Sequence, residues 1–446
     1  MMQKSRTFAG WVKWAAALAL SLGAVSAHAA LVNFYSATGK LALSVDGCGT
    51  TSTTCTVNVN KPNAAATVRA AFLMSVSNGG SHYQIPDGQV KLDGQPVNWD
   101  ASVAAAGTVD SYNHRADVTA LIKPALDAAS PGLNPLTIDE GLQVEGHALV
   151  VVFDDPTQTS DSSVLLNFGA QDTAGDTFNV TLASPVDPAA ANARLDMGLG
   201  ISFGYQEGGT PQYSIVEVNG QRLTTSAGGS DDGVPSNGAL ITVGGLGDSN
   251  DNPADPYALP TNARSDDELY SLLPFVTAST TSIAVYTQNP SNDDNIFFAY
   301  FYTSAPAIVG AGILLSETVN THPVGSSHTV QALVTDDHGV PQAGATVTFV
   351  VTSGPNAGKT GTANTNASGI ATFTYAGSGG VGADTIEASV GAVPTRLVSN
   401  SVSVNWVLAA TAAPSAVPAL GMSALTLMGL LLGGAGLGAL RRKPLV

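Results

Sequence analysis

The chain has 446 residues and carries 34 Asp and Glu against 17 Lys and Arg, a formal net charge of −17 at pH 7. A chain this acidic repels nucleic acids and anionic lipids, so those partners are disfavoured. The composition is rich in Gly, Thr, Val, Asn and Asp and poor in Lys and Glu, which favours strands and turns over helices. We therefore predict an all-β protein, with a length that allows two or three domains.

The N-terminal segment has the features of a secretory signal peptide. Three basic residues precede an apolar run over residues 14–25, and an Ala-His-Ala sequence at 27–29 supplies the small residues that a signal peptidase needs. We predict residues 1–29 as a signal peptide, with a mature chain that begins near Ala30.

The sequence contains two cysteines, Cys48 and Cys55. They are too few for a zinc site, which would need two more ligands nearby, and an exported context permits oxidation. We predict a disulfide that closes a hairpin loop between strands at 40–45 and 56–60. A loop this small limits the gain in stability to about 2 to 3 kcal/mol in the chain-entropy model.

From residue 30 to about residue 305 the sequence reads as short strands separated by turns, which predicts a β-sandwich head. An Asp-Gly pair at 93–94, a strong hairpin signal, lies between two such strands. Further on, a strand at 147–153 is followed by a turn and by a second strand at 164–168, and we interpret the pair as a hairpin.

Three patterns in the head recur in the same order, which suggests an internal repeat. The pairs are 90–97 with 216–223, 117–124 with 267–274, and 149–168 with 282–301. The offsets differ between the pairs, so chance similarity between β hairpins remains the alternative. A duplication would give two sandwich units, at 30–180 and 194–305.

The hydrophobic pattern of the sequence changes after a short linker near 304–312. Strands alternate with a period of two, with turns every eight to twelve residues, as in an immunoglobulin-like sandwich. The sequence at 336–349 and 365–375 resembles two motifs of the bacterial Ig-like domain, group 1, of intimin and invasin stalks: D-x-x-G-x-P-x-x-G-x-x-V-x-F and T-x-x-x-G-x-A-x-x-x-Y. The resemblance covers 313–404 and implies an Ig-like spacer or carrier of an adhesive tip, with no catalytic residues.

The C-terminal segment predicts a membrane span. Residues 405–416 form a linker of small residues and Pro, and 421–440 contain no charge. Twenty apolar residues in a helix reach about 30 Å, the thickness of the hydrocarbon core. The basic residues that follow, Arg441, Arg442 and Lys443, favour a cytoplasmic C-terminus and place the body of the protein outside the cytoplasm. Between the two export elements the net charge is −23, from 11 basic and 34 acidic residues.

Residues 417–446 resemble the sorting tails of Gram-negative surface proteins of the IPTL-CTERM and PEP-CTERM class: a short motif, an apolar helix and an Arg-rich end. The motif reads Val417, Pro418, Ala419 and Leu420 where the named one has Ile-Pro-Thr-Leu, and no Glu-Trp pair follows. The resemblance implies that an exosortase-like membrane peptidase removes the tail and passes the protein to the cell surface. The alternative is a plain single-pass anchor.

Oxygen donors at alternating positions suggest a Ca²⁺ loop formed by Asp248, Asn250 and Asn252, with Asp255 nearby. The EF-hand frame fails, because Pro253 stands where that frame requires Gly. Asp and Asn also dominate ordinary turns, so a turn is the alternative. A second cluster at 292–295 is a weaker candidate.

No catalytic motif is assembled in the sequence. Two constellations would favour an enzyme: His82, His114 and His147 meeting in space with Asp117 as orienter, or two carboxylates facing each other across a cleft. The candidates for that pair are Asp154 or Asp155 with Asp231 or Asp232.

We expect a non-enzymatic surface protein of adhesive or structural role, whose head binds a glycan, matrix or surface ligand. A secreted polysaccharide hydrolase and a permanently anchored periplasmic protein are the alternatives.

Overall fold

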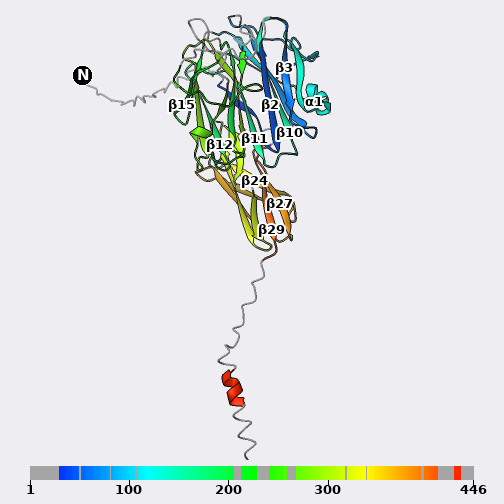
Figure 1. The fold of residues 1–446 in the computed structure, drawn as a ribbon, viewed down its shortest axis with the longest axis vertical. Coiled ribbons are helices and arrows are strands. Elements are labelled where there is room, and N and C mark those ends of the chain that lie inside the picture. Colours follow the sequence, from blue (N-terminus) through cyan, green and yellow to red (C-terminus); the bar gives the residue numbers. More distant parts are fainter. Residues whose placement is uncertain are drawn as a thin grey trace, which may run out of the picture.

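The computed structural model describes residues 30–49, 52–80, 82–105, 109–204, 212–228, 241–258, 268–316, 319–337, 339–392, 396–409 and 426–432. The described chain consists mostly of strands in antiparallel sheets, which confirms the prediction of an all-β sandwich class. Figure 1 shows a large head, from which a smaller module with β24, β27 and β29 extends.

The first sandwich of the head pairs two sheets. Inner sheet 1 contains, in spatial order, β2 (Leu41–Gly49), β10 (Val144–Asp154), β4 (Thr67–Ser77), β8 (Tyr112–Asp117) and β7 (Ala101–Ala104). Outer sheet 1 contains β3 (Thr54–Lys61), β9 (Gly132–Asp139), β5 (Lys91–Leu92) and β6 (Gln95–Pro96). Their facing side chains form one apolar core, to which helix α1 (Thr119–Ala128) adds Ile122 and Leu126.

The second sandwich is built in the same way. Inner sheet 2 contains β1 (Val32–Gly39), β11 (Ser162–Phe168), β19 (Asn295–Thr303), β13 (Leu195–Ser202) and β16 (Ile241–Val243), with β17 (Leu269–Ser271) also paired to β13. Outer sheet 2 contains β15 (Gln221–Ala227), β14 (Ser214–Val218), β18 (Ser282–Gln288), β12 (Asp176–Leu182) and β20 (Ala307–Val309). A second apolar core lies between them. A short 3₁₀ helix, η2 (Leu273–Phe275), follows β17.

The two inner sheets pack against each other, so the head has four layers. Strand β10 shows why: Leu149 and Val151 belong to the core of the first sandwich, whereas Val150 and Val152 belong to the core between the inner sheets. A strand buried on both faces reads as a continuous apolar run, which is the sequence of β10. Strand β19 does the same with Phe301 on one side and Phe298 on the other.

The two sandwiches share one strand order. Strands β2 to β10 correspond in chain order to β11 to β19, and α1 and η2 occupy the same place in the series. The sheet positions agree as well, except that β7 pairs with β8 whereas its counterpart β16 pairs with β13. Equivalent hairpins turn at Asp93-Gly94 and Asn219-Gly220, with φ of +47° and +73° in the first and +51° and +74° in the second. Positive φ at both central residues is the type I′ turn that suits a tight hairpin. The correspondence agrees with the first two repeated patterns of the sequence, 90–97 with 216–223 and 117–124 with 267–274. The third, 149–168 with 282–301, is wrong, because β10 corresponds to β19 and not to β18.

The strand pairing differs from two sequence-based expectations. The hairpin expected between 147–153 and 164–168 is wrong, because β10 pairs with β2 and β4 whereas β11 pairs with β1 and β19. Strands β11 and β12, which we placed in the unit at 30–180, are paired with strands of the second sandwich, as is β1. The physical reason is that β2 and β4 occupy both edges of β10, so no edge is left for the strand that follows, and the chain moves to the neighbouring layer.

The smaller module is a two-sheet sandwich. One sheet contains β21 (Gly312–Ser316), β23 (Ser327–Thr335) and β26 (Ile370–Ala376). The other contains β22 (Val319–Pro323), β29 (Val402–Val407), β27 (Gly382–Val390), β24 (Thr346–Ser353) and β25 (Thr360–Asn364), with β28 (Leu397–Val398) paired to β27. Their core includes the fully buried rings of Phe349 and Trp406. The hydroxyl of Thr335 donates to the carbonyl of Gly310 at 2.7 Å, beside the connection from the head.

The segments predicted as a signal peptide and a sorting tail lie mostly outside the described residues. This holds for residues 1–29, for the motif at 417–420 and for the basic residues at 441–443. Of the span expected at 421–440, residues 426–432 are described and form a short, exposed helical segment. Among the described parts of the chain, no helix is both long enough and apolar enough to cross a membrane.

Candidate functional site

Two adjoining pockets lie where the edge strand β2 of inner sheet 1 runs over inner sheet 2. Their volumes are about 360 and 320 Å³, and Gln158, Arg194 and Tyr302 line both. We call this depression the seam groove, defined by these three residues with Asp196 and Tyr300. It exists because two sandwiches are packed back to back and their edges do not coincide.

The seam groove combines aromatic and charged groups. The guanidinium of Arg194 lies over the Tyr302 ring, 4.4 Å from its centroid, and its Nε is 3.7 Å from Oδ2 of Asp196. The hydroxyl of Tyr302 donates to the Leu41 carbonyl at 2.8 Å, and that of Tyr300 to the Gly244 carbonyl at 3.1 Å. Burial raises the pKa of Asp196, against smaller lowering effects from Asn250 and Arg194. A ring face next to polar groups of both signs is typical of small-molecule sites.

The loop after β16 forms one wall of the seam groove. It lies close to β2: a Cβ at Gly245 would stand 2.3 Å from the Val45 carbonyl oxygen. The loop carries the four residues that we predicted as calcium ligands. Asp248 accepts from the Gly245 amide, Asn250 donates to Asp196, Asn252 exchanges two hydrogen bonds with Ser271, and Asp255 accepts from the Tyr257 amide. Asp248 and Asp255 thus accept from nearby amides, as in turns, whereas Asn250 and Asn252 join the loop to the more distant Asp196 and Ser271. Calcium binding by this loop stays a prediction.

A second candidate site lies at the beginning of β10, and we call it the β10 cluster: Ser75, Glu140, His147 and the disulfide of Cys48 with Cys55. The disulfide is formed, with Cα atoms 6.1 Å apart. It joins β2 of inner sheet 1 to β3 of outer sheet 1, so it links two facing sheets where we expected a hairpin within one sheet.

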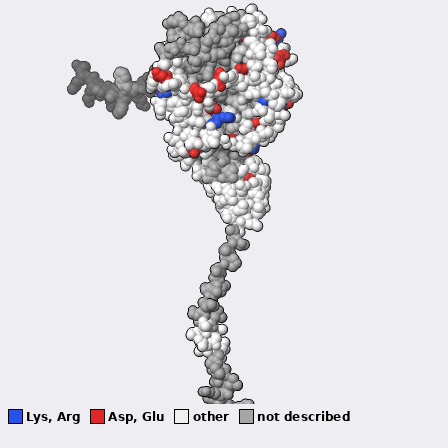
Figure 2. Space-filling model, viewed as in Figure 1, with Lys and Arg blue, Asp and Glu red and all other residues white. Residues whose placement is uncertain are grey.

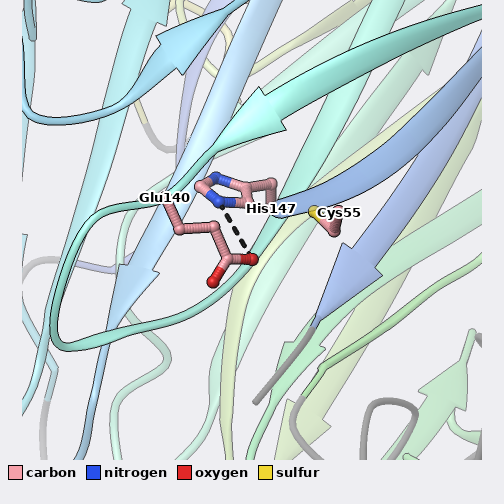
Figure 3. Close-up of side chains that lie close together, drawn as sticks. All are labelled: Cys55, Glu140 and His147. Carbon is pink, nitrogen blue, oxygen red and sulfur yellow. Dashed lines mark ion pairs between the residues drawn. The ribbon is translucent and has the colours of Figure 1, made fainter. Parts of the chain in front are cut away.

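Figure 3 shows Glu140 and His147 facing each other beside Cys55. Oγ of Ser75 lies 2.7 Å from Nδ1 of His147, and Nε2 of the same ring lies 3.5 Å from Oε1 of Glu140. Neither of these last two atoms has a hydrogen-bond partner, although His147 and Glu140 are only 0% and 2% exposed. One ligand atom each of Cys55, Glu140 and His147 lies within 4.8 Å of the others, so the three residues could hold a metal ion.

Other titratable groups surround the β10 cluster. Burial, followed by the charge of Glu140, raises the pKa of Glu145 to about 7. His114 is placed on the other side of Ser75 in inner sheet 1, and burial lowers its pKa to about 4. The pattern of hydroxyl, imidazole and carboxylate resembles a hydrolytic relay in order, but Ser75 is fully buried.

The histidine constellation suggested by the sequence does not assemble around Asp117. His82 is exposed, with Nδ1 2.6 Å from Oδ1 of Asp110. Asp117 instead accepts from the Thr119 amide at the start of α1, at 2.9 Å. His147 of β10 and His114 of β8 lie on either side of Ser75 in β4. Sequence spacing alone could not reveal this arrangement.

The second sandwich has a buried carboxyl at the equivalent place, the beginning of β19. Ser214 Oγ donates to Oδ2 of Asp294 at 2.7 Å, and Asn289 donates to the Asp294 carbonyl at 2.6 Å. Burial raises the pKa of Asp294 to about 7. Asn295 points elsewhere, donating to Asn113 at 3.1 Å in the core between the inner sheets.

The carboxylates suggested for a hydrolase have structural partners. Asp154 forms an ion pair with Arg69 at 2.8 Å. Burial by itself would raise the pKa of Asp155, but hydrogen bonds from Thr157, Asn63 and Gln158 lower it to about 2. The proposed opposite carboxylates at 231 and 232 lie outside the described residues.

The charge on the visible face of the molecule is dispersed. Figure 2 shows Asp and Glu scattered over the head among uncharged residues, with fewer Lys and Arg, and the smaller module nearly without charge on this side. This face therefore presents no broad basic surface.

Comparisons with known proteins give weak likenesses. No protein-family model matches the sequence, and no curated protein matches it. Among solved structures, an Escherichia coli alpha-2-macroglobulin activated by porcine elastase is 9% identical with a TM-score of 0.18, covering 83% of this chain and 35% of that one. A chain named BspA_C_mut is 7% identical with a TM-score of 0.11, covering 82% of this chain and 98% of that one. TM-scores this low do not establish a shared fold.

Proposed function

We propose that this protein is an exported, non-enzymatic cell-surface protein whose head binds a glycan of the surface or matrix in the seam groove. The observation that carries the proposal is the groove itself: two adjoining pockets of about 360 and 320 Å³ that share an aromatic ring, a cation and an amide. Sugars present apolar faces that pack on aromatic rings and hydroxyl groups that pair with charged and amide side chains.

The order of the parts supports display at the surface. The head comes first, the smaller two-sheet module follows, and the predicted linker and apolar tail come last. We propose that the module is a spacer and that the tail is a sorting signal for an exosortase-like membrane peptidase of a Gram-negative cell. Permanent anchoring in the periplasm is the rival for the tail, and polysaccharide hydrolysis is the rival for the head.

The test is glycan binding by the protein isolated from the native cell surface. Arg194→Gln removes the groove's cation and is expected to weaken binding about ten-fold or more, because a lost charge-assisted hydrogen bond costs about 1.5–3 kcal/mol. Arg222→Gln is the matched control, since Arg222 also lies over a tyrosine ring, Tyr257, and pairs with a carboxylate, Glu217, but in outer sheet 2.

Equal binding by both variants would contradict the groove as the binding site. Release of shorter saccharides from a bound glycan would replace the binding role by hydrolysis.

A further inference from the structure

We propose that the β10 cluster is a redox-controlled metal site: when the disulfide is reduced, the thiolate of Cys55 joins Nε2 of His147 and the carboxylate of Glu140 to bind a divalent metal ion of the zinc type. The disulfide and the metal are then alternative states of one site. This inference is independent of the seam groove and of the sorting tail.

The ligand atoms are already gathered. They come from three segments, β3, the residue after β9 and β10, and lie within 4.8 Å of one another (Figure 3). Because metal–ligand bonds of zinc are about 2.0–2.3 Å long, atoms around one ion lie about 3–4 Å apart, so small adjustments suffice.

The orientation of His147 favours metal binding through Nε2. Its Nδ1 is engaged by Ser75 Oγ at 2.7 Å, which is the outer contact that fixes the tautomer and ring plane of metal-bound histidines. The backbone of Glu140 is held as well, since its amide donates to Thr53 at 2.9 Å and its carbonyl accepts from Gln89 at 3.3 Å.

The unpaired atoms supply a second, independent observation. Oε1 of Glu140 and Nε2 of His147 are buried, face each other at 3.5 Å and lack a hydrogen-bond partner. Buried polar atoms in native proteins are normally paired, so two such atoms aimed at one space point to a group that satisfies both. A bound cation would satisfy both atoms at once, because each can donate a lone pair to it.

The chemistry balances with a dithiol as reductant. The dithiol gives two electrons and two protons to the S–S bond and becomes a disulfide itself, leaving Cys48 and Cys55 as thiols. Cys55 then loses its proton to solvent as it binds the metal, and Cys48 stays a thiol. The reverse exchange uses a small disulfide as oxidant: Cys55 takes up a proton as the metal leaves, and the two thiols pass two electrons and two protons to the small disulfide, which becomes a dithiol as the S–S bond of the protein forms again.

The donor set favours zinc over calcium or magnesium. Thiolate and imidazole are ligands of borderline and soft metals, whereas calcium and magnesium prefer oxygen alone. Three protein ligands leave a fourth tetrahedral position for water.

The test compares two single variants of the full-length protein. Cys48→Ser and Cys55→Ser both lose the disulfide, but only Cys48→Ser keeps the proposed ligand as a free thiol. Titrated with Co²⁺ as a spectroscopic probe, Cys48→Ser is expected to show a thiolate-to-cobalt charge-transfer band and tetrahedral d–d bands at one ion per chain. Cys55→Ser is expected to bind roughly a hundred-fold more weakly without the thiolate band, since loss of even an outer-shell partner costs about 10–100-fold.

A second measurement uses the wild-type protein and does not depend on the variants folding. After dithiol reduction, Zn²⁺ should slow alkylation of Cys55 more than that of Cys48, as read by peptide mass spectrometry. Equal Co²⁺ spectra for the two serine variants, or equal alkylation of both cysteines with and without Zn²⁺, would overturn the proposal.

Discussion

The two sandwiches of the head are alike in topology and different at one end of their central strands. Both place an apolar strand, β10 or β19, in the middle of a four-layer stack. At the beginning of β10 lie a disulfide, a buried imidazole and a buried carboxyl, whereas the beginning of β19 has a buried carboxyl that accepts from a serine hydroxyl. Alternating apolar residues therefore specify the scaffold, and the strand ends are where the two copies carry different chemistry.

The comparison also explains the seam groove. Packing two similar sandwiches back to back buries the faces of both inner sheets, but β2 at the edge of one sheet leaves part of β13 and β19 uncovered. The groove thus belongs to neither sandwich alone. Its residues Arg194 and Tyr302 come from the second sandwich, and Leu43 comes from the first.

The substitution with the greatest cost in stability tests whether the two sandwiches are energetically one unit. Phe298→Ala removes a buried ring between the inner sheets and should lower the free energy of unfolding by about 3–5 kcal/mol. Phe301→Ala, its matched variant in the core of the second sandwich, should cost a similar amount. Hydrogen exchange should rise in both β10 and β19 for Phe298→Ala but mainly in β19 for Phe301→Ala. Unchanged exchange of β10 amides in Phe298→Ala would mean that the sandwiches are energetically separate.

The next effect concerns the buried carboxyl of the second sandwich. Burial raises the pKa of Asp294 from 3.8 to about 7, so the folded state holds this proton more tightly than the unfolded state. The resulting stability is fully present below about pH 4 and is lost as the pH rises to about 7. Asp294→Asn should remove about 2 to 4 kcal/mol of this pH dependence, measured as unfolding free energy between pH 4 and 8. Parallel curves for the variant and the wild type would contradict the assignment.

The disulfide should have a smaller effect, confined to the first sandwich. Cys55→Ser is expected to lower the unfolding free energy by about 2 to 3 kcal/mol, because the bond closes a short loop. Protease sensitivity and hydrogen exchange should increase at β2 and β3 and remain unchanged at β11 and β12. An equal increase in the second sandwich would show that the bond stabilises the whole head.

The smallest effect on stability is expected from Asp155, which follows the C-terminal end of β10 and is held ionised. Its pKa is lowered from 3.8 to about 2, so its contribution is present above about pH 4 and is lost as the pH falls to about 2. Asp155→Asn should lower stability at pH 7 by about 1 to 2 kcal/mol and flatten the acid limb of the unfolding profile. The Asp154→Asn variant serves as a control, since its ion pair with Arg69 is partly exposed and should contribute little.

Local sequence patterns predicted the elements better than their partners. The Asp93-Gly94 turn and the run at 147–153 were recognisable because hairpin chemistry and strand burial act over a few residues. The unbroken apolar run indicated burial of β10 on both faces, but it does not say which strands pair with it. The hairpin expected after β10 was wrong because β2 and β4, two distant segments, occupy both of its edges.

The candidate sites were harder to predict because they depend on contacts between distant segments. The disulfide followed from the cysteine count, but nothing in the spacing of Glu140 and His147 places them beside Cys55. The seam groove requires Gln158 and Tyr302 to meet across two sheets, and no local motif marks them. The Asp and Asn residues at 248–255 were conspicuous in the sequence, but no local pattern showed that Asn250 and Asn252 bond to Asp196 and Ser271.

Export and display at the cell surface predict where the mature chain ends, so the position of the C-terminus is the most direct test. We would recover the protein from surface and shed fractions of the native cell and identify its last residue by peptide mass spectrometry. Sorting predicts an end close to residues 417–421, with the basic tail absent. An intact Arg441, Arg442 and Lys443 in all fractions would contradict it and would mean that the tail is a lasting membrane anchor.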